Sequence, residues 1–172
     1  MITEKMKSSK LILLVFVSVC IYMSASSQNI LMNILTQNSG KVSRGSTSFL
    51  EVTICNTDAT DSVPVYKLKP QISIPTAIAN IPPTGHKLPP GWTITSNSGS
   101  TIRLSNGTDM IPAHGCRTIL IAIEGKAIGG PSTISGNLLF ANGEAPGSAP
   151  GGPTQGDNPA DNASTSTCIV TR

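Results

Sequence analysis

Alternation of apolar and polar residues at period two is the feature that most constrains the fold of this chain. In the segment 48–56, Leu50, Val52 and Ile54 fall on one face of an extended strand, and the other face carries polar side chains. The segment 117–124 repeats the pattern, with isoleucine at every second position. Two strands that each bury one face predict two sheets packed against each other.

Other segments have the same character, and none has the 3.6-residue period of a helix. The further predicted strands are 29–36, 63–68, 71–75, 91–95, 101–104, 132–140 and 164–171. Prolines at 64, 70 and 75 remove ladder donors and place their strands at a sheet edge. Short strands separated by turn residues predict an all-β fold, an antiparallel immunoglobulin-like β-sandwich with Greek-key connections.

The first 27 residues have the layout of a secretory signal peptide. Three lysines precede the apolar run Leu11–Met23, and small residues then predict cleavage after Ser27. A retained signal anchor and a lipoprotein site at Cys20 are the alternatives. Cleavage leaves a chain without a membrane segment, which we expect to be secreted to the bacterial cell surface.

Charge excludes some partners. The leader contributes three lysines and one glutamate, so its removal lowers the formal charge from +3 to +1. No basic patch remains for nucleic acid or anionic lipid. The surface must consist of Ser, Thr, Asn, Gly and Pro, which repel copies of the same chain only weakly.

Three cysteines follow the leader, and an exported chain meets an oxidising compartment. One disulfide is therefore expected among Cys55, Cys116 and Cys168. The pair Cys55–Cys116 is favoured because each member borders a core strand. The third cysteine is then either buried and free or paired between chains.

The mature chain divides into an N-terminal strand and linker (28–45) and a sandwich (46–172) with a Gly/Pro-rich loop at 142–163. The N-terminal strand is apolar on both faces, which is unusual at a sheet edge. The apolar residues are Ile30, Leu31, Met32, Ile34 and Leu35. Either this segment is the first strand of its own sandwich, or it completes the sheet of a neighbouring copy by strand addition.

Four short motifs occur in order along the mature chain. They are Val52–Thr57, Leu88–Trp92, Ile111–Gly115 and Asp157–Asn162. Together they resemble the immunoglobulin-like "conserved repeat" domains of bacterial cell-surface proteins, and the likeness covers residues 40–171. The resemblance implies a surface role with no assigned biochemistry. Members of that family usually occur as tandem repeats, whereas this chain carries one copy, and its apolar N-terminal strand and three cysteines are additional.

No catalytic motif is present, so we expect no enzymatic activity. His86 and His114 lie beside Pro or Gly in predicted loops. His114 and Cys116 could bind a soft metal, but the sequence offers no third ligand. Trp92 alternates with Ile94 and is predicted to lie in the core.

Oxygen side chains cluster near the C-terminus, at Asp157, Asn158, Asp161 and Asn162. These residues predict either a Ca²⁺ site or turns capped by Asx side chains; no other cofactor is expected. Ser62 lies in a short match to a bacterial O-glycosylation acceptor.

Two functions follow from these features. The first is a secreted structural subunit that assembles with copies of itself into a filament or surface layer through its N-terminal strand. The alternative is a monomeric adhesin or ligand-binding module that uses the loop 142–163. Its partner would be a surface glycan or another cell-surface protein.

Overall fold

The computed structural model describes residues 29–153 and 156–172, so the predicted signal peptide lies outside the described residues. The described residues form eleven strands and two short 3₁₀ helices. The strands are β1 (Ile30–Thr36), β2 (Lys41–Ser43), β3 (Thr47–Asn56), β4 (Leu68–Ser73), β5 (Ala79–Asn80), β6 (Thr93–Asn97), β7 (Thr101–Ser105), β8 (Cys116–Gly125), β9 (Gly129–Ala141), β10 (Pro150–Gly151) and β11 (Ala163–Thr171). The helices are η1 (Asn38–Gly40) and η2 (Pro159–Asp161).

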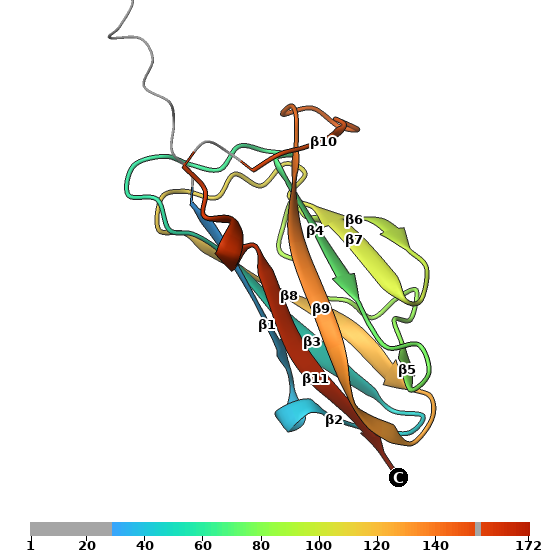
Figure 1. The fold of residues 1–172 in the computed structure, drawn as a ribbon. Coiled ribbons are helices and arrows are strands. Elements are labelled where there is room, and N and C mark those ends of the chain that lie inside the picture. Colours follow the sequence, from blue (N-terminus) through green and yellow to red (C-terminus); the bar gives the residue numbers. More distant parts are fainter. Residues whose placement is uncertain (1–28, 154–155) are drawn as a thin grey trace, which may run out of the picture.

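The strands form two curled sheets packed face to face (Figure 1). The first sheet has the order β1-β3-β8-β5. The second has the order β2-β11-β9-β4-β7-β6, with β10 paired to β9. All pairs are antiparallel except β2 with β11. The predicted immunoglobulin-like β-sandwich is confirmed. Neither helix in the described part of the chain has the length and apolarity needed to cross a membrane.

The period-two pattern identified the core correctly. Every second residue of β3 is buried, and β3 pairs with β8 from Thr47 to Cys55. The isoleucines 119, 121 and 123 of β8 are fully buried. Trp92 is 5 % exposed, which confirms its predicted place in the core.

The predicted strand 63–68 is wrong: Val63 makes only an isolated bridge with Ile111, and β4 begins at Leu68. The predicted edge position of Pro70 is also wrong, because β4 lies between β9 and β7. The register explains why proline is tolerated there. β7 pairs with β4 only from Gln71 to Ser73, so the missing N–H of Pro70 lies where β4 has no ladder partner on that side.

The buried side chain of Asn106 connects three segments of the chain. Its Oδ1 accepts a hydrogen bond from the Leu68 backbone N–H at 2.9 Å, and its Nδ2 donates to the Pro64 and Asp109 carbonyls at 2.7 and 2.8 Å. Because every polar atom of this buried amide is paired, it fixes the start of β4 against the loop after β7.

β1 lies within its own sandwich, which is the first of the two alternatives that its sequence left open. Ile30, Met32 and Ile34 are 0–3 % exposed. Gly136 in β9 provides space for Met32 and Ile34: a methyl group there would overlap Cδ1 of Ile34 and lie 2.9 Å from Cε of Met32. On the opposite face, Leu31 is half-buried and Leu35 is 59 % exposed.

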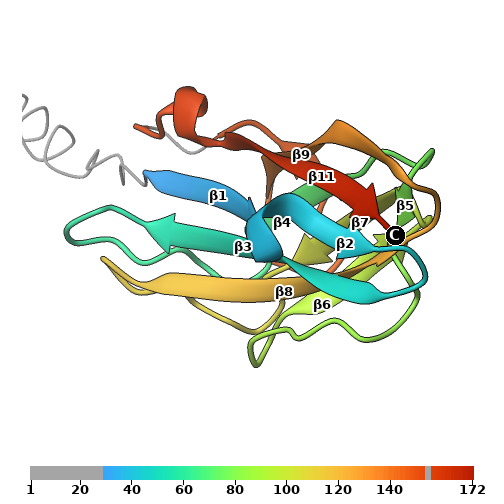
Figure 2. The same ribbon diagram turned by 90° about the horizontal axis from the view of Figure 1, so that it is seen from below.

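The outer edge of β1 lies beside β11 (Figure 2). Side chains of β11 contact the backbone of β1 here. The N–H groups of Ile34 and Thr36 donate to the hydroxyls of Ser164 and Ser166, each at 3.0 Å. These donors are therefore occupied, and β1 offers less of an open edge to a second chain.

The disulfide joins Cys55 and Cys116, and Cys168 is buried and free. The two bonded cysteines are directly opposite each other on β3 and β8, on the outer face of the sheet. The bond therefore connects neighbouring strands of one sheet. Burial raises the pKa of the Cys168 thiol, and its position in the core places it out of reach of another chain.

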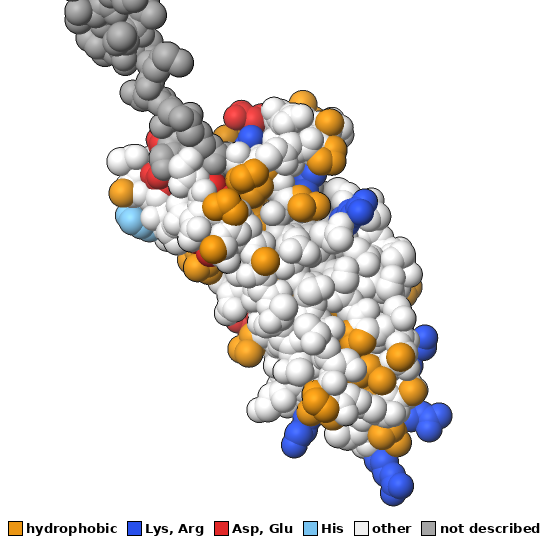
Figure 3. Space-filling model, in the orientation of Figure 1, with side chains coloured by type: hydrophobic (Ala, Val, Ile, Leu, Met, Phe, Trp, Pro, Cys, Tyr) orange, Lys and Arg blue, Asp and Glu red, His pale blue; other side chains and the backbone are white. Residues whose placement is uncertain are grey.

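The surface is poor in charge, as the composition predicted. On the face drawn in Figure 3, most side chains are uncharged. Some basic side chains lie toward the end of the molecule that holds the C-terminus, and others lie nearer the opposite end.

Candidate functional site

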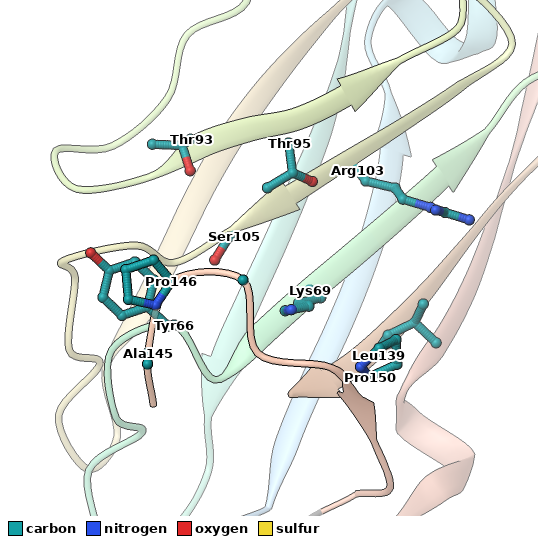
Figure 4. Close-up of a pocket in the computed structure, with 11 residues that line it drawn as sticks. Tyr66, Lys69, Thr93, Thr95, Arg103, Ser105, Leu139, Ala145, Pro146 and Pro150 are labelled. Atoms are coloured by element: carbon teal, nitrogen blue, oxygen red, sulfur yellow. The ribbon is translucent and has the colours of Figure 1, made fainter. Parts of the chain in front are cut away.

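A pocket of about 440 Å³ lies on the outer face of the larger sheet, beneath the chain that joins β9 to β10 (Figure 4). Outward-facing residues of four strands form its floor. They are Lys69 in β4, Thr93 and Thr95 in β6, Arg103 and Ser105 in β7, and Leu139 in β9. This volume falls within the range of small-ligand sites, roughly 300–1,000 Å³.

The connection between β9 and β10 forms the roof together with the start of β10. It contributes Ala145, Pro146 and Gly147, and β10 contributes Pro150. The connection folds back on itself, since the Asn142 N–H donates to the Ala149 carbonyl at 2.9 Å. Lys69 in β4 holds it from below, since its Nζ donates to the Ser148 carbonyl. Lys67, just before β4, donates from Nζ to the carbonyl of Ala141 at the end of β9, at 3.0 Å. The roof is thus fixed to β4.

Tyr66 lies at one end of the pocket together with Pro146, and Leu139 and Pro150 lie at the other (Figure 4). The backbone of Tyr66 has a φ of 58°, in the left-handed region that bulky residues rarely adopt. Its N–H donates to the Gly107 carbonyl at 3.0 Å. Strained conformations of this kind cluster at ligand-binding sites, which marks Tyr66 as a candidate contact residue.

Cations but no carboxylates line the pocket. Arg103 is exposed, and its Nε donates to Gln71 Oε1 at 2.8 Å. The two terminal nitrogens of its guanidinium make no hydrogen bond within the described residues. An arginine held at Nε, with its terminal N–H groups unpaired among the described residues, is suited to a carboxylate. Leu139, 40 % exposed, adds an apolar contact on the same floor.

The site lies only partly in the predicted loop. The roof belongs to the loop 142–163, for which the sequence predicts a binding role. The floor residues come from strands for which the sequence predicts no binding role. No short motif contains Tyr66, Lys69 and Arg103, because the sheet brings them together from separate segments. The positive φ of Tyr66 leaves no signal in the sequence.

Cys116 is bonded to Cys55, so its sulfur cannot serve with His114 as a thiolate ligand for a soft metal. No group of three or more His, Cys, Asp or Glu side chains able to hold a metal occurs in the described part of the chain. The ring of His86 instead completes the edge of β8. Its Nδ1 accepts from the Ala122 N–H at 3.1 Å, and its Nε2 donates to the Pro82 carbonyl at 3.0 Å. This pair of contacts requires the neutral ring, because a protonated Nδ1 cannot accept.

The protein should lose stability as the pH falls from 7.5 to 5.5, because burial lowers the pKa of His86 below its ordinary value. Above pH about 6.5 the ring is neutral in both states; below it, the unfolded chain takes up a proton that the folded chain resists. A His86→Gln variant, whose amide oxygen can accept the same bond at any pH, should lose most of this dependence. Urea unfolding at the two pH values measures it. An equal change in the free energy of unfolding between the two pH values in both proteins would contradict the role of His86.

A second polar contact fixes the loop before β8. Arg117 binds both carboxylate oxygens of Asp109, with Nε at 2.7 Å and a terminal nitrogen at 2.8 Å, and Trp92 Nε1 donates to Asp109 at 2.7 Å. Burial alone would raise the pKa of Asp109, but the contacts with Arg117 and Trp92 outweigh it, so the pKa lies below its ordinary value. The carboxylate therefore stabilises the fold above pH about 4.

The predicted calcium residues lie around η2, between the start of β1 and the start of β11. Asn158 caps this helix, since its Oδ1 accepts from the Ala160 N–H at 3.2 Å. The remaining contacts of Asp157, Asp161 and Asn162 are considered below. Ser62 is half-buried, and its glycosylation stays a prediction.

The sequence matches no protein-family model, and no curated protein matches it either. Solved structures share the fold at low identity. A cohesin module from a Clostridium perfringens family 33 glycoside hydrolase is 10 % identical and has a TM-score of 0.50; the match covers 83 % of this chain and 98 % of that one. This similarity supports the sandwich fold.

Two further structures are more distant. The CARDB domain of a Pyrococcus furiosus protein, solved in complex with di-metal ions, is 11 % identical with a TM-score of 0.47, covering 87 % of this chain and 93 % of that one. A Nocardia farcinica protein with an immunoglobulin-like fold is 14 % identical with a TM-score of 0.44, covering 80 % and 98 %. The strand topology and the cohesin module support the likeness to an immunoglobulin-like domain at the level of the fold. The likeness to the "conserved repeat" family stays a prediction.

Proposed function

We propose that this chain is an exported, non-catalytic binding module that holds an acidic oligosaccharide in the pocket between the β9–β10 connection and the outer face of β4, β7 and β6. The observation that carries the proposal is the chemistry of the pocket lining. It combines a tyrosine, two cations and several hydroxyl groups, with no carboxylate.

Each part of the lining suits a negatively charged sugar. The Arg103 guanidinium can bind a uronate carboxylate through two parallel hydrogen bonds. Tyr66 and Leu139 offer apolar surface to the C–H face of a pyranose ring. The hydroxyl groups of Thr93, Thr95 and Ser105 can exchange hydrogen bonds with ring hydroxyls. A few well-placed polar groups of this kind give small-ligand sites their specificity.

A peptide strand fits this part of the molecule less well. Peptides that add to a sheet need an open edge with regular backbone donors and acceptors. The edge next to the pocket is β6, which has a bulge between Ile94 and Ser96 that interrupts its ladder. The pocket itself lies on the face of the sheet, beneath a roof, where backbone pairing cannot occur.

The disulfide between Cys55 and Cys116 supports export, since such bonds persist in oxidising compartments. Attachment at the bacterial cell surface and the absence of catalysis belong to this proposal as well.

Calorimetric titration with trigalacturonic acid tests the proposal, with neutral cellotriose as the comparison ligand. The acidic trisaccharide should bind and the neutral one should bind at least tenfold more weakly. Arg103→Ala should weaken acidic binding about ten- to hundredfold, because a hydrogen bond to a charged group contributes about 1.5–3 kcal/mol. Arg44→Ala, which removes an exposed arginine between β2 and β3, is the matched control. Equal binding of both sugars, no binding, or equal loss in both variants would overturn it.

Assembly through β1 stays a prediction of the sequence. In a filament this strand would have to leave Gly136 and the hydroxyls of Ser164 and Ser166 and make equivalent contacts in a neighbour. Negative-stain imaging and size exclusion of the purified protein distinguish the two functions. Filaments would favour assembly, and a monodisperse monomer would favour the binding module.

A further inference from the structure

The segment 157–162, which contains η2, contacts the start of β1 and leads into β11. Asp157 Oδ1 accepts a hydrogen bond from the Ile30 N–H at 3.0 Å, at the start of β1. The Asn158 N–H donates to Asn29 Oδ1 at 3.1 Å. The same segment leads directly into β11. Whatever binds here therefore acts on both strands at once.

Two buried side-chain oxygens of this segment have no hydrogen-bond donor among the described residues: Oδ1 of Asp161 and Oδ1 of Asn162. The Asn162 side chain is only 9 % exposed, and its Nδ2 donates to Asp157 Oδ2 at 2.5 Å, which directs this amide toward the Asp157 carboxylate. Buried acceptors without a donor are rare because each loses its hydration without replacement.

The chemistry of the unsatisfied groups indicates what they lack. Both atoms are oxygens, one of them belongs to a carboxylate, and a second carboxylate, that of Asp157, is in contact with the Asn162 amide. The ion pair found in the described part of the chain joins Arg117 and Asp109, so no lysine or arginine neutralises Asp157 or Asp161 there. A hard cation satisfies both needs, since it brings positive charge and prefers oxygen ligands.

We propose that Asp157, Asp161 and Asn162 bind one Ca²⁺ ion, which joins the start of β1 to the start of β11. Asn158 acts as the helix cap and not as a ligand, because its Oδ1 accepts from Ala160. Calcium suits the site better than magnesium. It accepts an irregular set of carboxylate and amide oxygens completed by water, whereas Mg²⁺ demands octahedral geometry and gives up its water reluctantly. This site is separate from the sugar pocket and does not depend on it.

Calorimetry and thermal unfolding of the purified protein test the proposal, first in EDTA and then with CaCl₂ or MgCl₂. We expect one Ca²⁺ per chain with a Kd of about 0.1–1 mM, the range of extracellular calcium modules. Millimolar Ca²⁺ should raise the Tm, and Mg²⁺ at the same concentration should raise it less. The absence of calcium heat together with an unchanged Tm would overturn the proposal, as would an equal response to both metals.

Two variants locate the site. Asp161→Asn keeps the shape of the side chain and should weaken calcium binding at least tenfold, while Glu144→Gln, which removes an exposed carboxylate from the β9–β10 connection, should leave it unchanged. Asn162→Asp should lower the Tm in EDTA, because it places another carboxylate against Asp157, and should enlarge the rise on adding Ca²⁺. A smaller rise in Asn162→Asp, or full binding in Asp161→Asn, would contradict this ligand set even if one variant folds poorly.

Discussion

A variant with serine at both Cys55 and Cys116 should have a free energy of unfolding about 4 kcal/mol below that of the parent protein. The disulfide closes a segment of 61 residues, and the entropy that such a cross-link removes from the unfolded chain corresponds to roughly this value. A loss of this size is a large fraction of the total stability of a single domain. Urea unfolding at pH 7.5 measures it.

Reduction provides the control. Dithiothreitol should lower the urea midpoint of the parent protein to that of the double variant and leave the variant itself unchanged, because Cys168 forms no bond. If the variant and the parent unfolded at the same urea concentration, the disulfide would contribute nothing to stability.

Gly136→Val should loosen the packing of β1 on the core and destabilise the protein by about 1–3 kcal/mol. Even a single methyl group at this position overlaps the end of the Ile34 side chain, so the larger side chain forces the ends of Ile34 and Met32 to move. Overpacking of a core typically has a cost of this size. Unfolding in urea measures the loss, and size exclusion shows whether the loosened strand pairs with another copy.

Asn137→Val is the matched control, because it places the same side chain one residue further along β9 on the exposed face. It should change stability by less than about 0.5 kcal/mol. If Gly136→Val behaved like this control, β1 would not depend on the glycine for its place. A dimer in Gly136→Val alone would show that β1 can pair in a neighbour once its own site is blocked.

The sequence predicted those parts of the fold that depend on regular alternation. Period-two patterns predict β3, β8 and β11. The disulfide between Cys55 and Cys116 could be predicted because each cysteine borders one of the core strands. β2, β5 and β10 were missed because two or three residues are too few to show a period. Pro70 misled the prediction because a central strand can have a locally unpaired side, and only the register reveals it.

The candidate site was harder to predict for a physical reason. Its roof, 142–151, could be recognised as an unusual loop, but its floor is assembled from strands that neighbour each other only in the folded sheet. The packing site of β1 could not be predicted for a similar reason. The sequence shows a glycine at position 136, but it does not show that the space beside it receives Ile34.

The hydroxyl contacts between β1 and β11 have a consequence for the behaviour of the protein at high concentration. A chain with so few charges cannot rely on electrostatic repulsion to keep its copies dispersed at high local density. Ser164 and Ser166 offer a different safeguard, since they occupy two backbone donors at the β1 edge of the sheet with the molecule's own atoms. Two small alcohol groups would then help to keep copies of this domain apart where its net charge does little.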